Sequence, residues 1–242
     1  MGMVNWIWKE LRNLLKMLKL KNNSPGKDRV IIFDIDDTLV QTINCKWLAL
    51  KQTARKYYQL EVTDSHIKIY WGLPFEKMVL GVFSEIDSFE TIKKHYLEIS
   101  ESFPMQPQEG AVSTIAKLKE NFVICALTAS SRSVILQDLI DAGFNLEDFY
   151  TIQTAEDTDF HKPDPRVFLP TLAKLEKIKI SSDKITYVGD SVKDYLAACK
   201  IHINFIGVLS GLTSREEFLD SGTHSSNIIE RLEELIFKMQ DL

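Results

Sequence analysis

Five short apolar runs that alternate with stretches of helical periodicity constrain the fold of this sequence more than any other feature. The runs are rich in Val, Ile, Phe and Tyr and cover residues 30–33, 122–127, 149–153, 185–188 and 203–208. The helical patterns cover residues 110–119, 131–142, 165–176, 191–199 and 227–238. Such alternation is typical of a parallel sheet covered by helices. We therefore predict an α/β fold with a doubly wound parallel sheet.

Almost ninety residues separate the first apolar run from the second. A simple crossover needs only about a dozen, so the sequence indicates an insertion. Residues 44–105 show helical periodicity with a break at Gly72, Leu73 and Pro74. We predict that they form an inserted all-helical cap domain of about four helices. The predicted core then consists of residues 27–43 and 106–242.

Residues 1–26 precede the first apolar run and have a pattern of their own. Apolar residues recur there at helical spacing, and residues 1–23 carry five Lys or Arg against one Glu, a net charge of +4. We predict an amphipathic basic helix followed by a linker. Adsorption to a membrane surface is one role for such a helix. Packing of its apolar stripe on the domain or on a second subunit is the more common one.

The composition favours small solutes over nucleic acid as partners. The formal net charge is -5, and no basic run interleaved with aromatic residues follows the N-terminal segment. The three cysteines lie far apart and form no CxxC pair, which disfavours a disulfide framework and favours a reducing, cytoplasmic compartment. No stretch reaches the roughly 18 uninterrupted apolar residues that a membrane-spanning helix needs. The sequence does not indicate an oligomeric state.

Three carboxylates directly follow the first apolar run. Asp34, Asp36 and Asp37 continue the run at residues 30–33, which argues against an acidic turn with fully solvated side chains. At the carboxyl end of a buried strand they would repel one another strongly unless a cation lay between them. Hard oxygen ligands at a sheet edge suit Mg²⁺. The sequence therefore predicts a magnesium site here.

A second acidic segment follows the fourth apolar run. Gly189 and Asp190 end that run, and Asp194 lies in the predicted helix after it. In open parallel sheets, ligands bind outside the carboxyl ends of the strands, near the point where the strand order reverses. We therefore predict that Asp34 and Asp190 lie on adjacent central strands and share one ion. Gly189 would permit a close approach of the backbone.

Groups suited to an anion follow the second and third apolar runs. Thr128 and Ala129 lie just before a predicted helix, where a hydroxyl and backbone N–H groups meet. Lys162, in the HKPDP segment at 161–165, brings a positive charge to the same edge. Neither residue is specific alone, because Thr before a helix is usually a cap and a lone loop Lys is usually solvated. Together the four run ends predict a phosphoryl-transfer site.

In type, order and spacing, these residues resemble the four motifs of the haloacid dehalogenase-like hydrolase superfamily. The resemblance begins at about Arg29 and extends to the C-terminus. The HKPDP segment, the helical insertion, the WGLPF segment at 71–75 and residues 207–215 are most similar to the phosphoglycolate phosphatase branch. The resemblance implies a Mg²⁺-dependent phosphatase acting on a small phosphate ester, phosphoglycolate-like or a sugar phosphate. The insertion would serve as a lid that excludes water and selects the substrate.

The resemblance also implies a role for each residue at the predicted sheet edge. Asp34 would be the nucleophile that forms an aspartyl-phosphate, and Asp36 would be the general acid and base. Thr128, the Ala129 N–H and Lys162 would bind the phosphate. The implied metal ligands are Asp34, Asp36, Asp190 and Asp194.

Several neighbouring residues receive weaker interpretations. Asp37 stands where many members of the superfamily have Gly, so we expect it to be structural. Ser130 and Ser131 are left without a role. Tyr70, Trp71 and Phe75 could touch the leaving group, but aromatic residues at helical spacing are more often core residues.

Two other functions remain open. A phosphomutase of the same superfamily would share these residues and differ mainly in excluding water, so release of inorganic phosphate separates the two. A non-catalytic regulatory or scaffold protein would keep the fold without turnover, with residues 1–23 as a membrane tether. The intact acidic and phosphate-binding residues argue against that alternative.

Overall fold

The computed structural model describes residues 27–73 and 75–239 and divides into two compact units. The sheet unit is formed by the described residues up to Val40 and from Pro107 onward. The helical unit spans Gln41–Gln106, slightly longer at both ends than the insertion predicted at 44–105. The role of the helical unit as a cap stays a prediction.

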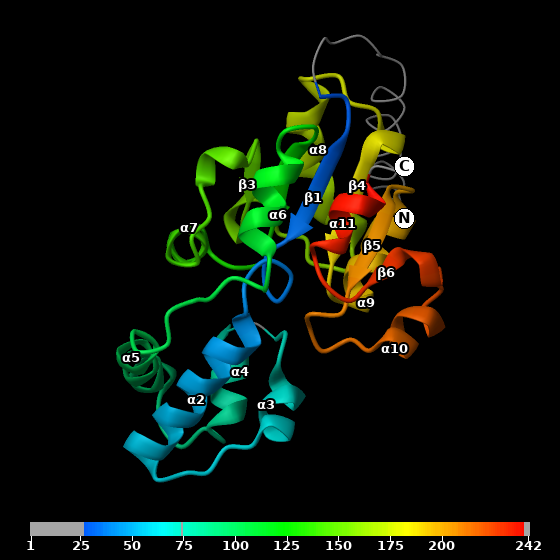
Figure 1. Cartoon of the computed structure of the whole chain (residues 1–242). Coiled ribbons are helices and arrows are strands. Elements are labelled where there is room, and N and C mark those ends of the chain that lie inside the picture. The colour runs from blue at the N-terminus through cyan, green and yellow to red at the C-terminus, as the bar shows by residue number, and fades with distance from the viewer. Residues whose placement is uncertain (1–26, 74, 240–242) are drawn as a thin grey trace, which may run out of the picture. The chain divides into compact units, whose positions relative to one another are not determined.

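Within the described residues, the sheet unit contains a six-stranded parallel sheet in the order β3-β2-β1-β4-β5-β6 (Figure 1). The strands are β1 (Val30–Asp34), β2 (Val123–Leu127), β3 (Thr151–Gln153), β4 (Ile185–Gly189), β5 (Asn204–Val208) and β6 (Ile228–Ile229). The chain runs outward from β1 to β3, returns to the centre at β4 and runs outward again to β6. The prediction of a doubly wound parallel sheet is therefore confirmed. The strand order reverses between β1 and β4, which is where such folds bind ligands.

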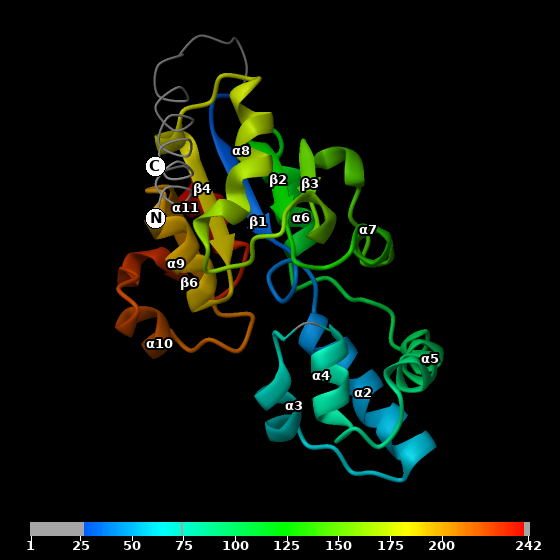
Figure 2. The same ribbon diagram turned by 180° about the vertical axis from the view of Figure 1, so that it is seen from behind.

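Helices cover both faces of this sheet. In Figures 1 and 2, α6 (Ala111–Leu118) and α11 (Glu234–Lys238) lie over one face, and α8 (Leu169–Glu176) and α9 (Val192–Lys200) lie over the other. The sheet unit also contains α7 (Arg132–Asp141), after β2, and α10 (Arg215–Asp220), after β5. Because both faces are covered, all five residues of β1 are buried. This explains why the first strand reads as a continuous apolar run instead of an alternating one.

The helical unit contains α2 (Thr42–Tyr58), α3 (Asp64–Tyr70), α4 (Phe75–Val82) and α5 (Phe89–Ser100) in its described part. Thr63 and Ser88 cap α3 and α5 through side-chain oxygens that accept from backbone N–H groups. Gly72 lies between α3 and α4, at the predicted break. It adopts a positive φ of 84°, a conformation that Gly enters without steric cost.

The sequence-based assignment is wrong near the C-terminus. Residues 227–238 are predicted as one helix, but the structure places strand β6 at Ile228–Ile229 and begins helix α11 only at Glu234. A two-residue edge strand is too short for periodicity to distinguish it from part of a helix. Helix α10 is also absent from the prediction.

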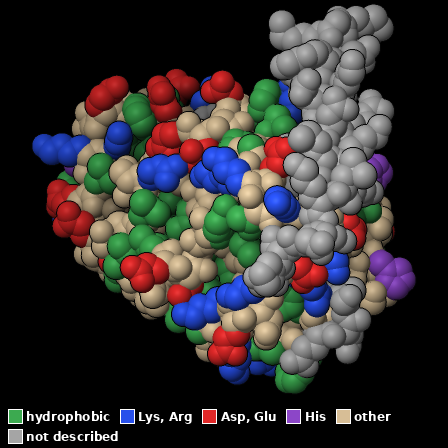
Figure 3. Space-filling model, turned by 90° about the horizontal axis from the view of Figure 1, so that it is seen from above, with side chains coloured by type: hydrophobic (Ala, Val, Ile, Leu, Met, Phe, Trp, Pro, Cys, Tyr) green, Lys and Arg blue, Asp and Glu red, His purple; other side chains and the backbone are tan. Residues whose placement is uncertain are grey.

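The surface carries charges of both signs. On the face drawn in Figure 3, Lys and Arg side chains are interspersed with Asp and Glu. No helix formed by the described residues is both long and apolar enough to cross a membrane. The basic helix predicted at residues 1–23 lies outside the described residues. The cytoplasmic location stays a prediction.

Candidate active site

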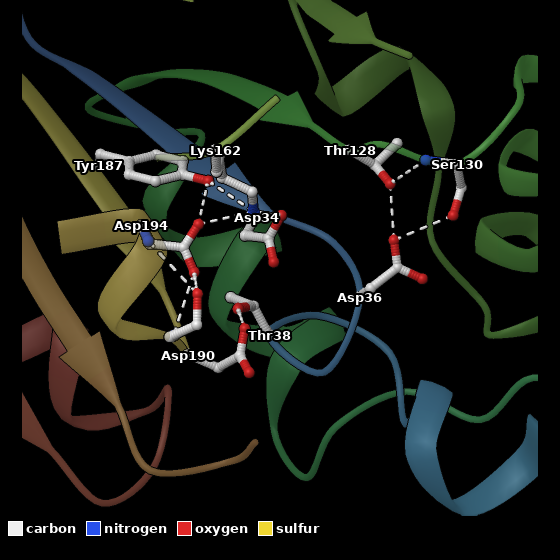
Figure 4. Close-up of polar contacts among 10 residues, drawn as sticks. Asp34, Asp36, Thr38, Thr128, Ser130, Lys162, Tyr187, Asp190 and Asp194 are labelled. Atoms are coloured by element: carbon white, nitrogen blue, oxygen red, sulfur yellow. Dashed lines mark hydrogen bonds and ion pairs between the residues drawn. The ribbon is translucent and has the colours of Figure 1, made fainter. Parts of the chain in front are cut away.

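The candidate active site lies in the sheet unit, at the carboxyl ends of the strands beside the reversal of strand order (Figure 4). Asp34 is the last residue of β1, Thr128 directly follows β2, and Asp190 directly follows β4. Because parallel strands end at the same edge of a sheet, these residues from distant parts of the sequence meet there.

Three carboxylates form the centre of the site. Asp34, Asp190 and Asp194 each offer an oxygen atom, and these atoms lie within 4.8 Å of one another. Burial raises the pKa of the Asp34 carboxyl well above its ordinary value, against the lowering effect of the Lys162 ammonium. Burial, reinforced by the nearby Asp194 carboxylate, raises the pKa of Asp190 to about 8. Ionisation of both carboxyls would therefore place more negative charge in the cluster than its surroundings stabilise.

Lys162 brings a positive charge to this cluster. Its Nζ lies 2.7 Å from Asp34 Oδ1 and 2.6 Å from Asp194 Oδ1. It also donates a hydrogen bond to the hydroxyl oxygen of Tyr187, at 3.3 Å. Burial lowers the pKa of the Lys162 ammonium, but the carboxylates of Asp194 and Asp34 outweigh burial and hold it well above its ordinary value. Lys162 is therefore a fixed cation.

Asp194 holds Lys162 in place. It is fully buried in the first turn of α9, where it forms a capping box with Ser191. Its Oδ2 accepts from the Ser191 N–H and hydroxyl, and its Oδ1 accepts from Lys162 and from the Tyr187 hydroxyl at 2.8 Å. A Cβ atom on Gly189 would lie 2.6 Å from Asp194 Cγ, so the absence of a side chain at 189 allows this packing.

Asp190 is held on the other side of the cluster. Thr38 Oγ1 donates to Asp190 Oδ1 at 3.4 Å. Gly211, in the loop after β5, lies so close that an added Cβ would be 1.8 Å from Asp190 Oδ2 and 2.7 Å from its Cγ. The position of the Asp190 carboxylate therefore requires a residue without a side chain at position 211, which lies 21 residues further along the chain.

Asp36 lies apart from the three clustered carboxylates in Figure 4. Its Oδ2 accepts hydrogen bonds from the Thr128 hydroxyl at 2.6 Å and from the Ser130 hydroxyl at 3.1 Å. The Thr128 oxygen in turn accepts from the Ser130 N–H at 2.9 Å. The structure thus gives Asp36 an environment of hydroxyl donors rather than carboxylates.

Asp37 occupies a special backbone position in the turn after β1. It is buried, its φ is 60°, and its N–H donates to the carbonyl oxygen of Val40 at 2.9 Å. This left-handed conformation is easiest for Gly and is tolerated by Asp and Asn. The backbone thus accounts for Gly or Asp at this position, as expected for a structural residue.

The residues predicted to bind phosphate border a common space. Thr128, Ala129 and Lys162 line one small pocket together with residues of the loop after β3, among them Thr158 and Phe160. A backbone hydrogen bond joins the loop after β2 to the loop after β3: the Ala155 N–H donates to the carbonyl oxygen of Ser130 at 3.0 Å. The pocket is therefore formed by loops of defined geometry.

The donor set of the carboxylate cluster fits a hard divalent cation. If all groups were ionised, three carboxylates would face one ammonium, and oxygen donors are the ligands that Mg²⁺ prefers. The oxygens of Asp194 already accept four hydrogen bonds, so Asp34 and Asp190 are the better candidates for direct ligands. The carboxylate of Asp36, also a predicted ligand, is turned toward Thr128 and Ser130.

Three residues of the site were not singled out from the sequence. Tyr187 lies inside the apolar run of β4, where it is indistinguishable from a core residue. Ser130 follows Thr128 and looked like part of a helix cap. Gly211 lies in a segment already noted for its resemblance to phosphoglycolate phosphatases, which was the one available signal.

Comparisons with known proteins show what this chain is similar to. The family model of haloacid dehalogenase-like hydrolases matches residues 31–208. The presumed pyrophosphatase PpaX of Caldanaerobacter subterraneus is 27% identical over 189 residues, which cover 75% of this chain and 82% of that protein. The phosphoglycolate phosphatase of Aquifex aeolicus is 28% identical over 171 residues, which cover 69% of this chain and 78% of that protein.

A solved structure shows the same architecture. A presumed haloacid dehalogenase-like hydrolase from Bacteroides fragilis is 25% identical, with a TM-score of 0.68 and coverage of 86% of this chain and 100% of that chain. The fold and the site thus define an α/β hydrolase with an acidic site at the switch point of its sheet. The chain belongs to the haloacid dehalogenase-like hydrolase family, as its sequence motifs predicted.

Proposed function

We propose that this protein is a Mg²⁺-dependent phosphatase that hydrolyses a small phosphate monoester through an aspartyl-phosphate on Asp34. The observation that carries the proposal is the placement of Asp34 at the switch point, in contact with Lys162 and clustered with two further carboxylates. Family membership and the phosphatase names of the relatives support the reaction class. We also propose that the substrate is of the phosphoglycolate or sugar phosphate type.

The first half-reaction uses Asp34, Lys162 and Asp36. A carboxylate oxygen of Asp34 attacks the phosphorus, and the bond between phosphorus and the leaving oxygen breaks. Lys162, the Thr128 hydroxyl and the Ala129 N–H hold the other phosphate oxygens. Asp36 donates a proton to the departing oxygen, which leaves as an alcohol. Bound Mg²⁺ would supply the positive charge that lets an anionic phosphate approach an anionic carboxylate.

The second half-reaction restores the enzyme. The ionised Asp36 accepts a proton from a water molecule, and the resulting hydroxide oxygen attacks the phosphorus. The bond between phosphorus and the Asp34 oxygen then breaks and inorganic phosphate is released. The hydrogen bonds from Thr128 and Ser130 to Asp36 support this role, because they fix one carboxylate oxygen and define where the other points.

The raised pKa values support the need for a cation. Asp34 must be ionised to act as a nucleophile, yet burial raises its pKa well above the ordinary value. Lys162 lowers the pKa of Asp34 only in part. A divalent cation held by Asp34 and Asp190 would stabilise both ionised carboxylates, and we assign Asp194 the role of keeping Lys162 oriented.

A phosphate-release screen tests the proposal. The purified full chain is incubated with Mg²⁺ and a panel that contains phosphoglycolate, several sugar phosphates, pyrophosphate and an aryl phosphate. We expect release of inorganic phosphate from at least one ester, loss of activity in excess EDTA, and no activity in Asp34→Asn. Turnover by Asp34→Asn at the wild-type rate would overturn the assignment of the nucleophile. Isomerised ester without free phosphate would indicate a mutase.

A further inference from the structure

Tyr187 is a buried polar residue for which the proposed reaction has no role. It is the third residue of β4, and its side chain is fully buried. Its ring packs edge to face on Phe168, with ring centroids 4.9 Å apart, and lies near Phe205 at 6.2 Å. These contacts fix the position of the ring. The hydroxyl nevertheless reaches the candidate active site (Figure 4).

The hydroxyl of Tyr187 is part of a closed ring of three groups. It donates to Asp194 Oδ1 at 2.8 Å and accepts from Lys162 Nζ at 3.3 Å, while Lys162 also donates to the same Asp194 oxygen at 2.6 Å. Burial raises the pKa of the Tyr187 hydroxyl well above its ordinary value, so the hydroxyl keeps its proton and remains a donor to Asp194.

This arrangement uses every donor that Lys162 has. An ammonium carries three N–H groups, and three acceptors surround this one: Asp34 Oδ1, Asp194 Oδ1 and the Tyr187 oxygen. A phosphate oxygen can bind Lys162 only if one of these acceptors gives up its N–H. The two carboxylates form short, charge-assisted hydrogen bonds, whereas the Tyr187 oxygen is neutral and lies further away.

We propose that Tyr187 is a positioning residue whose hydroxyl occupies the third N–H of Lys162 until a substrate phosphate takes its place. This inference rests on the proposed function, since it assumes that Lys162 binds phosphate. While the site is empty, Tyr187 satisfies an N–H that would otherwise be buried without a partner. When phosphate binds, the Tyr187 hydroxyl keeps its bond to Asp194, so Asp194 stays oriented and Lys162 turns only one of its three N–H groups.

Tyr187→Phe distinguishes this role from a purely structural one. The substitution keeps the ring and its packing but removes the acceptor, so phosphate no longer has to displace a hydrogen bond. We expect inorganic phosphate, titrated calorimetrically in Mg²⁺ buffer, to bind about three- to tenfold more tightly than to the wild type, the scale of one hydrogen bond. Damage to the packing would weaken binding instead. Unchanged or weaker binding would therefore overturn the proposal.

Two controls isolate the effect. Tyr195→Phe removes a hydroxyl from α9 that lies outside this ring, and phosphate affinity should stay within about twofold of the wild type. In a Lys162→Met background, Tyr187→Phe should no longer tighten binding, because the competing N–H is gone. Tightening in that background would show that Tyr187 acts elsewhere.

A measurement that needs no Tyr187 variant gives an independent test. Saturating phosphate should produce an ultraviolet difference spectrum of a buried tyrosine, in the wild type and in Tyr195→Phe, because the Tyr187 oxygen loses its hydrogen bond from Lys162. A flat spectrum at saturation would overturn the proposal. If phosphate binds but no ester is hydrolysed, the proposed function fails, while these titrations still decide the role of Tyr187.

Discussion

Magnesium should compete with protons for the carboxylate cluster. Burial and the Asp194 carboxylate raise the pKa of Asp190 to about 8 in the metal-free protein. At pH 7 about nine-tenths of the Asp190 carboxyls would then hold a proton. Mg²⁺ binds the ionised form, so each binding event at pH 7 should release about one proton from Asp190. Asp34, whose pKa is also raised, would add to this release.

The magnitude follows from the position of that pKa. Below pH 8, the proton displaced from Asp190 alone should make the apparent affinity for Mg²⁺ rise about tenfold per pH unit, and a proton displaced from Asp34 would steepen this rise. Between pH 8 and pH 9 the remaining rise for Asp190 should be only about twofold, since most of the carboxyl is already ionised. The relevant window is therefore pH 6 to 9.

Calorimetry can measure both quantities. Mg²⁺ titrations in two buffers of different ionisation enthalpy give the number of protons released, and titrations across the window give the affinity slope. Asp220→Asn, which changes an exposed carboxylate of α10, is the matched control and should behave like the wild type. An affinity that is independent of pH between 6 and 8, with equal heats in both buffers, would refute the reasoning.

The raised pKa of Asp190 also predicts how the stability of the metal-free protein changes with pH. The folded pKa of Asp190 lies above its ordinary value of 3.8, so the folded state binds the proton more tightly than the unfolded state. The favourable contribution is complete below about pH 4 and is lost as the pH rises toward 8. In this interval Asp190 should lower the free energy of unfolding by up to about 1.4 kcal/mol per pH unit. Denaturation in EDTA should show a shallower pH dependence for Asp190→Asn than for the wild type.

Three further substitutions test separate features. Asp36→Asn should slow hydrolysis of alkyl phosphates roughly 100-fold or more, and with an aryl phosphate it should accumulate aspartyl-phosphate on Asp34, seen as a burst in rapid-quench experiments. Gly211→Ala should displace the Asp190 carboxylate and weaken Mg²⁺ binding about 10- to 100-fold while the protein still folds, as calorimetry and thermal unfolding would measure. Gln153→Leu should destabilise the protein by about 2–4 kcal/mol in denaturant titrations, because the buried Gln153 amide donates to a carbonyl oxygen and accepts two hydrogen bonds.

Each of these expectations has a clear contrary result. Equal losses for alkyl and aryl substrates without a burst would show that Asp36 does not act in both half-reactions. Wild-type metal affinity in Gly211→Ala would mean that Asp190 does not bind the ion or that its loop moves freely. A loss below about 1 kcal/mol in Gln153→Leu would mean that water satisfies the groups left behind.

The sheet and the edge where the site lies could be predicted because both follow from local patterns. Each central strand is a continuous apolar run, and Asp34, Thr128 and Asp190 directly follow such runs, so a parallel sheet brings them together. The contacts between these residues could not be predicted. The hydrogen bond from Thr128 to Asp36 depends on how two loops meet after folding.

The position of the Tyr187 hydroxyl is the clearest example of a feature that the sequence pattern could not predict. Within the β4 run it fits a buried strand position as well as Val or Phe would. Only the three-dimensional arrangement places its hydroxyl between Lys162 and Asp194. Strand β6 was missed for a different reason, since two residues are too few for any periodicity.

The close approach of Gly211 to Asp190 restricts how this enzyme can change during evolution. A side chain at position 211 and a carboxylate in its present place at position 190 exclude each other, because the added Cβ would overlap that carboxylate. Lineages that gain a side chain at 211 should therefore have lost or relocated the acidic group at 190, and with it the metal site proposed there. In an alignment, a side chain at 211 together with a non-acidic residue at 190 would thus mark descendants that have lost the proposed site.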